Sequence, residues 1–212
     1  MVIKPSRKVE KEKMNVKLEL LEPMLGTAPK DKGLYARFVG DKAPDGRGEE
    51  ELEDIKCGVG AENAGWTIFR GDEFGLYVPD FMIKGFLKSA AIALKSQFNL
   101  GQPKAKIDRL VFVYPRKIRL IDGNGNVKKE PDGVIERSLR AETMKGDRIA
   151  LARSDYVNPG LILEFDIVLL KNKEIKLEDI VFWLNYGEEL GLGQWRNGGW
   201  GRFKVIKAET VD

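Results

Sequence analysis

The sequence contains no histidine and only one cysteine, Cys57. A single cysteine cannot form a disulfide within the chain. Without histidine, neither the common zinc sites nor the Ser-His and Cys-His catalytic pairs can be assembled. We therefore expect no metal site and no cofactor, and we expect no hydrolase that depends on these pairs.

Long apolar runs are also missing. No stretch approaches the roughly 20 apolar residues of a membrane-spanning helix, and residues 1–8 lack the apolar centre of a signal peptide. We therefore expect a cytoplasmic protein without a membrane partner. With 212 residues, of which 42% are hydrophobic and 33% charged, the chain is expected to fold as one domain over residues 1–212. A charged tail at residues 1–13 should precede its first strand.

Charge of either sign is distributed unevenly along the chain. The formal net charge of +3 is too small by itself to argue for a polyanionic partner. Half of residues 41–54 are Asp or Glu, which is usual for a solvated loop. Residues 194–207 carry only basic charges, and this segment is the better indication of a binding surface. Its basic residues are Arg196, Arg202, Lys204 and Lys207.

The first part of the chain predicts a strand followed by a loop-rich insertion. Val16, Leu18 and Leu20 alternate with charged residues, which is the period of a half-buried strand. Residues 27–77 are then rich in Gly, Asp, Glu and Lys, and we interpret them as an insertion. Short strand-like pieces occur within it at 34–39 and 65–69.

A helix is predicted over residues 80–96, because alanines are frequent there and Asp80 is a suitable N-cap. Lys84 and Lys88 are four residues apart, so they share one side of this helix. The stripe is either a solvated helix face or part of a surface that binds anions.

The second part of the chain adds two strands around another insertion. Residues 109–121 are β-branched and aromatic, and we expect a strand that bends or breaks at Pro115. Residues 122–159 are polar and only weakly periodic, which indicates a second insertion. Alternating apolar residues at 161–169 predict the third strand.

A second helix and a last strand complete the predicted core. Leu177, Ile180, Val181 and Leu184 follow helical spacing. A brief edge strand is expected at 203–206. The order of strand, helix, strand, strand, helix, strand predicts an α+β protein with a ferredoxin-like (RRM-like) βαββαβ core.

The glycine-rich segment at residues 191–203 matches neither of two common phosphate-binding motifs. It lacks the Gly-Lys-Ser/Thr of a Walker loop, and it follows a helix and precedes a strand, the reverse of a dinucleotide fingerprint. Its glycines allow close backbone approach, its arginines can bind phosphates, and its tryptophans can stack on bases. The alternative is a glycine-rich turn with core tryptophans.

Residues 191–203, Gly-Leu-Gly-Gln-Trp-Arg-Asn-Gly-Gly-Trp-Gly-Arg-Phe, resemble the C-terminal glycine-rich loop of the RAMP superfamily (repeat-associated mysterious proteins). This superfamily supplies the backbone subunits of CRISPR effector complexes and their guide-processing endoribonucleases. The order of predicted elements agrees with the ferredoxin-like fold that the resemblance implies.

Two further segments resemble the same superfamily. Residues 78–90 are similar to the family pattern that opens the first helix, with Lys84 and Lys88 at the basic positions and Ile83 in place of the usual Leu. Residues 20–26 are similar, more weakly, to the end of the first strand.

The resemblance implies a backbone subunit that binds single-stranded guide RNA, with the second insertion acting as a thumb-like hairpin. Copies would line the RNA head to tail beside other effector subunits. Met144 is either a wedge between bases or an ordinary loop residue. The helix and the glycine-rich loop must then meet in one groove. The residues implied to bind RNA are Lys84, Lys88, Arg140, Lys145, Arg148, Arg153, Gly193, Trp195, Arg196, Gly198, Gly199, Trp200, Gly201 and Arg202.

Two other functions remain open at this point. Endoribonucleases of the superfamily often use a histidine, which this chain lacks, and target-cleaving subunits use an acid after the first strand. Asp31, Asp41 and Asp45 lie in the corresponding region, but none sits in an alignable motif, so we assign no catalytic residue. A stand-alone or virus-borne protein that coats single-stranded nucleic acid would need the same basic helix and loop.

Overall fold

The computed structural model describes residues 8–31, 65–98, 100–143 and 146–211, with the main chain alone at 139–143 and 146–150. The strand-like piece predicted at 34–39, the acidic run at 41–54 and Cys57 lie outside these residues.

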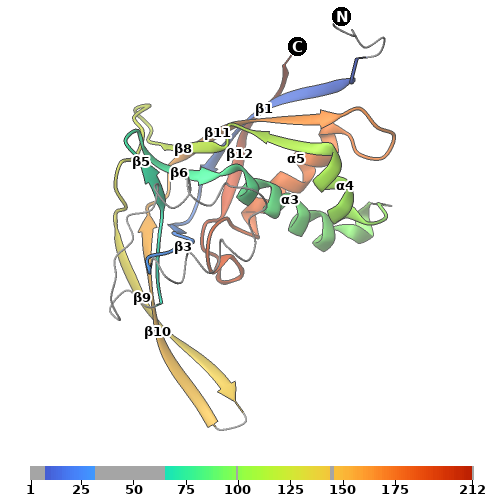
Figure 1. The fold of residues 1–212 in the computed structure, drawn as a ribbon. Helices are drawn as coiled ribbons and strands as arrows, with labels where there is room; N and C mark the ends of the chain where they lie inside the picture. The colour runs from blue at the N-terminus through green and yellow to red at the C-terminus, as the bar shows by residue number, and fades with distance from the viewer. Residues whose placement is uncertain (1–7, 32–64, 99, 144–145, 212) are drawn as a thin grey trace, which may run out of the picture.

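A seven-stranded sheet forms the centre of the fold (Figure 1). Its strands follow the order β12-β1-β11-β8-β6-β5, and β7 also pairs with β11. Their bounds are β1 Lys11–Leu20, β5 Arg70–Asp72, β6 Gly75–Pro79, β7 Val111–Tyr114, β8 Lys117–Ile121, β11 Ile162–Leu170 and β12 Phe203–Val211.

Among the described residues, three helices cover one face of this sheet (Figure 1). They are α3 (Asp80–Ala93), α4 (Pro103–Leu110) and α5 (Leu177–Asn185). Short 3-10 turns follow as η2 (Lys95–Gln97), η3 (Tyr186–Glu188) and η4 (Arg196–Gly198). The core lies between the sheet and these helices, where Phe86 of α3 and Phe203 of β12 meet edge to face with ring centroids 4.9 Å apart.

The predicted period of the central strands is confirmed. In β1 every second residue from Met14 to Leu20 is buried, and in β11 the same holds from Leu163 to Leu169. The charged residues between them lie on the other face, where Lys17 forms an ion pair with Glu164 at 3.0 Å. One face of the sheet is therefore apolar and packed, and the other is charged.

The ferredoxin-like core predicted from the sequence is also confirmed. β12, β1, β11 and β7 are neighbours in that order, and each pair is antiparallel. Along the chain, α3 lies between β1 and β7, and α5 lies between β11 and β12. This arrangement places the last strand beside the first, then the third and then the second, with both helices on one face.

Helix α4 is not predicted by the sequence. Pro103 begins it, and Arg109 and Leu110, expected in the second strand, are its last residues. Only Pro103 and Ile107 are buried in it, so the helix leaves little periodic signal. The break at Pro115 is confirmed, because β7 ends at Tyr114 before a cis Tyr114–Pro115 bond.

Two boundaries differ from the sequence expectation. β1 begins at Lys11, so the last three residues of the expected tail at 1–13 belong to the strand. Asp80 is the first residue of α3 and Pro79 occupies the N-cap, although the Asp80 carboxylate accepts a hydrogen bond from the Phe81 amide at 2.8 Å. Lys11, Glu12 and Lys13 are paired with β11 in the sheet.

A second sheet contains strands from both segments that the sequence predicts as insertions. β10 forms a long hairpin with β9, pairs antiparallel with β2 and parallel with β4, and β4 pairs with β3. The hairpin extends away from the helices (Figure 1). The bounds are β2 Met24–Leu25, β3 Ala28–Pro29, β4 Trp66–Ile68, β9 Gly133–Thr143 and β10 Gly146–Val157.

Candidate nucleic-acid interface

Tightly packed glycines, among them Gly193 and Gly201, shape the glycine-rich loop between η3 and β12. A Cβ placed on Gly201 would lie 2.0 Å from the Leu192 carbonyl oxygen, and one on Gly193 would lie 2.6 Å from that of Leu25. Both residues also have positive φ, 69° and 83°. Gly193 and Gly201, which the resemblance implies as RNA-binding, therefore have a clear role in shaping the loop.

The middle of the loop is more open. A Cβ on Gly198 would have its nearest neighbour at 3.7 Å, in Trp200, and one on Gly199 would be 3.7 Å from Arg202. Trp200 is half-buried, whereas the Trp195 side chain is 47% exposed. Of the two tryptophans, Trp195 is therefore the one that offers a ring to a ligand.

Arg137 of β9 stacks on Trp195, with Cζ 4.2 Å from the ring centroid. Its Nη2 donates a hydrogen bond to Ser154 Oγ at 2.9 Å. Its Nε and Nη1 are buried and have no hydrogen-bond partner among the described residues. Burial lowers the pKa of the Arg137 guanidinium below its ordinary value. The sequence does not predict this residue.

Gln194 fixes the loop to the base of the hairpin. Its Oε1 accepts hydrogen bonds from Thr67 of β4 at 3.1 Å and from Ser154 of β10 at 3.3 Å, and a longer one from Arg137 at 3.4 Å. Ser154 is fully buried. Because three separate strands meet at one side-chain oxygen, the loop and the hairpin form a single surface.

Arg196 connects the loop to helix α3. Its Nη2 donates to Ser89 Oγ at 3.2 Å, and the Ser89 hydroxyl donates to the Gly85 carbonyl at 3.1 Å. Ser89 directly follows Lys88 in α3, and a Cβ on Gly85 would meet nothing within 4 Å. The lysine-bearing helix and the arginine-bearing loop therefore meet, as a single binding track requires.

The two lysines of α3 are held by α4. Lys88 forms an ion pair with Asp108 at 2.9 Å, and Lys84 Nζ donates to the Asp108 carbonyl oxygen at 2.9 Å. Burial lowers the pKa of Lys84, although nearby Asp108 opposes this effect. Lys84 is therefore less available to a ligand than the sequence predicts, because the unpredicted helix α4 lies against it.

The other basic residues predicted to bind RNA either lie beside an acid or have side chains outside the described part of the structure. Arg153 of β10 forms an ion pair with Glu136 of β9 at 3.1 Å, and Arg202 lies 3.6 Å from Glu22. Both charges are partly neutralised by these neighbours. Lys145 lies outside the described residues, as do the side chains of Arg140 and Arg148.

We refer to Lys88, Ser89, Arg137, Trp195 and Arg196 as the candidate RNA surface. It combines an exposed indole, two guanidinium groups and an ammonium group from three parts of the chain. Guanidinium groups bind phosphates through paired N–H donors, and an indole stacks on bases of any sequence. The surface suits the binding of a single-stranded polynucleotide.

Within the described part of the chain, no group of three or more Cys, Asp or Glu side chains could hold a metal ion. Asp41 and Asp45 lie outside this part. None of the described helices is long and apolar enough to cross a membrane.

No family model and no curated protein matches the sequence. One similar solved structure is a chain of "Cryo-EM structure of the Type III-B Cmr-beta bound to cognate target RNA". The two share 12% sequence identity with a TM-score of 0.45, over 95% of this chain. The chain spans 61% of the length of that chain.

Proposed function

We propose that this protein binds single-stranded RNA through the candidate RNA surface, as a backbone subunit of a CRISPR-type ribonucleoprotein complex. The observation that carries the proposal is that the glycine-rich loop contacts the hairpin through Trp195 and helix α3 through Arg196. Arg137 of the hairpin stacks on Trp195 of the loop, and Arg196 of the loop donates a hydrogen bond to Ser89 of α3. A phosphate chain that passes over the loop would meet cations on both sides of an exposed base-stacking ring.

The wider proposal follows the resemblance of the sequence to RAMP proteins. Copies of the chain bind head to tail along one guide RNA, together with other effector subunits, and the β9–β10 hairpin acts as the thumb. The proposal includes a cytoplasmic location, as expected from the sequence. The proposal also divides the chain into a core and two insertions, at 27–77 and 122–159.

The binding site is tested with two charge-removing variants, Arg196→Ala and Lys88→Ala. Each should weaken the binding of a single-stranded RNA several-fold and make the plot of log affinity against log salt shallower by about 0.7, the loss of one phosphate contact. Lys173→Ala is the matched control, because Lys173 is an exposed lysine in the β11–α5 connection. An unchanged salt slope in both site variants, with intact folding, would reject the site.

The biological role is tested by the nucleic acid that copurifies with the protein. RNAs of uniform length that carry a common repeat would support the effector subunit, and the particle size would give the number of copies per RNA. Heterogeneous single strands would instead indicate a coating protein. Metal-dependent cleavage of a bound target would indicate a nuclease.

A further inference from the structure

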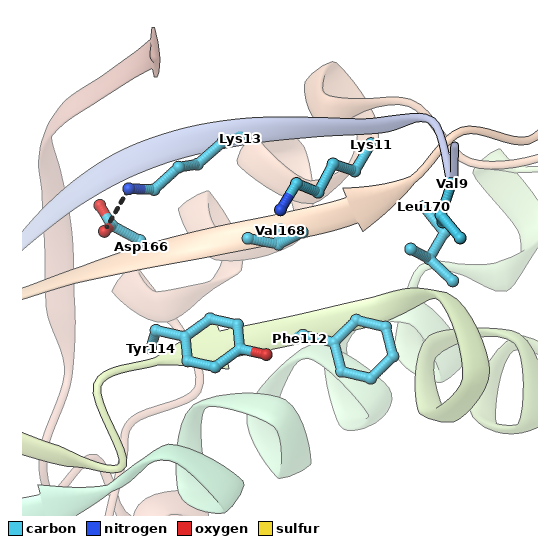
Figure 2. Close-up of a pocket in the computed structure, with 8 residues that line it drawn as sticks. All are labelled: Val9, Lys11, Lys13, Phe112, Tyr114, Asp166, Val168 and Leu170. Carbon is cyan, nitrogen blue, oxygen red and sulfur yellow. Dashed lines mark ion pairs between the residues drawn. The ribbon is translucent and has the colours of Figure 1, made fainter. Parts of the chain in front are cut away.

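The face of the central sheet opposite the helices carries an aromatic pair at one corner. Phe112 and Tyr114 are two residues apart in β7, so they point to the same face, and Val111 and Val113 point into the core. Figure 2 shows the two rings side by side along the strand. Tyr114 is 52% exposed. The rings line a pocket of about 550 Å³ together with apolar residues of β11 and the N-terminal segment.

The pairing register sets what surrounds these rings. Val168 of β11 lies opposite Phe112 on one side and Lys13 of β1 on the other. Neighbouring strands are about 4.8 Å apart, so Lys13 begins about 10 Å from Phe112. The aromatic corner is therefore bordered by a lysine-bearing strand. Figure 2 shows Lys11 extending over β11 toward Val168, while Lys13 points to Asp166.

The charge of this corner is positive. Its acid, Asp166, forms an ion pair with Lys13 at 2.9 Å and accepts a hydrogen bond from Asn15 at 3.0 Å. Lys11 lines the same pocket and has no ion-pair partner within the described ranges. In the adjoining part of the face, Lys17 and Lys204 are both paired with acids, so the excess positive charge of the corner comes from Lys11.

The corner is also continuous with the candidate RNA surface. Lys84 lies one helical turn before Lys88 in α3, and its Nζ is 5.1 Å from the centroid of the Phe112 ring. The contacts Arg196–Ser89, Lys88–Asp108 and Lys84–Phe112 thus form a chain from the glycine-rich loop to the edge of the sheet. A single-stranded RNA that leaves the glycine-rich loop along α3 would reach Phe112 and Tyr114.

We propose that Phe112 and Tyr114 form a second stacking platform, on which bases of the same single-stranded RNA lie while Lys11 binds a phosphate. This inference rests on the proposed RNA-binding function and extends its path around β7. Aromatic rings on an open sheet face, with cations beside them, accept bases of any sequence because every base has a stacking face. The rings of Phe112 and Tyr114 provide the apolar surface for a base, and Lys11 provides the positive charge for its phosphate.

The test uses the full chain and a uridine-rich RNA of about 20 nucleotides that contains photoreactive 4-thiouridine. Crosslinked peptides are identified after trypsin digestion, which releases residues 110–116 as one peptide. We expect crosslinks in this peptide. Tyr114→Ala should weaken RNA binding on the order of tenfold, whereas Tyr114→Phe should bind as tightly as the unchanged protein.

Phe74→Ala is the control, because Phe74 is a 63% exposed aromatic residue in the β5–β6 turn. If RNA binds but no crosslink maps to 110–116 and Tyr114→Ala binds normally, the second platform is wrong and the candidate RNA surface is unaffected. If Tyr114→Ala changes the size of the assembly without changing RNA affinity, the corner is a protein contact and the inference is also overturned. Failure of the unchanged protein to bind RNA would reject both proposals.

Discussion

The guanidinium of Arg137 lies over the indole of Trp195, with Cζ 4.2 Å from the ring centroid. This contact joins a hairpin residue to a loop residue that is distant in the sequence. Trp195 itself has φ 56°, a left-handed backbone conformation that is uncommon for a bulky residue and persists only where the surrounding structure fixes it. The ring is therefore oriented before any ligand arrives, which reduces the entropy lost on binding.

Replacing Arg137 tests whether this orientation matters. Arg137→Ala should weaken RNA binding on the order of tenfold, since it removes a cation and releases Trp195. Arg137→Lys keeps the charge but loses the planar group that stacks, so its affinity should lie between the two. Affinity and its salt dependence, measured for all three proteins, separate these effects. If Arg137→Lys binds like the unchanged protein, only charge is needed there.

The core could be predicted because its strands are buried on one face only. β1 and β11 alternate buried and charged residues over their length, and α5 buries Ile180, Trp183 and Leu184 at helical spacing. These periodicities are properties of each segment alone. The order of the segments then limits the topology to very few arrangements.

The candidate RNA surface could be predicted only in part. Trp195 and Arg196 stand out in a basic, glycine-rich segment, but Arg137 is 57 residues away from Gln194, and the pairing of hairpin with loop leaves no local pattern. The predicted role of Lys84 changes for a related reason. Helix α4 covers it, and the few buried residues of α4 do not produce a recognisable helical signal.

Replacement of glycine by alanine should affect the melting temperature very differently at two positions of the loop. Gly201→Ala should lower the melting temperature strongly, because its Cβ would meet a backbone oxygen at 2.0 Å and its φ is 69°. Gly198→Ala should leave the melting temperature almost unchanged, since its nearest neighbour would be 3.7 Å away. Thermal unfolding followed by circular dichroism checks both. Equal destabilisation by the two variants would contradict this geometry.

Asp72 should make stability depend on acidic pH. Two hydrogen bonds from Arg119, of 2.6 and 2.8 Å, hold the pKa of the Asp72 carboxyl far below its ordinary value, with Lys117 and the Phe74 amide contributing. A lowered folded pKa stabilises the protein above the unfolded pKa of about 4, and this stabilisation is lost as the pH falls below it.

The variant Asp72→Asn measures that contribution. Near pH 7 it should be less stable by about 2 kcal/mol, and the difference from the unchanged protein should shrink steadily below pH 4. Urea unfolding at a series of pH values checks this. Glu164→Gln is the control, because its ion pair with Lys17 is only half-buried and should contribute less than about 1 kcal/mol. A difference that does not change with pH would show that Asp72 is not ionised in the folded protein.

Asp108 restrains both lysines of α3, so its removal should strengthen RNA binding. In Asp108→Asn the ion pair with Lys88 is lost, and Lys88 becomes available to a phosphate. We expect a tighter complex and a salt dependence steeper by about 0.7, the value of one added phosphate contact on a single strand. Stability should change by less than about 1 kcal/mol, because the pair is at the surface.

The matched control for Asp108→Asn is Glu174→Gln, which removes the same charge from an acid paired with Lys106 of α4. Net charge changes equally in the two variants, so a general electrostatic effect would strengthen RNA binding in both. A local effect would appear in Asp108→Asn alone, and it should disappear when Lys88→Ala is added, because the lysine that Asp108 releases is then absent. Persistence of the gain in that double variant would mean that the RNA does not pass over α3 beside Lys88.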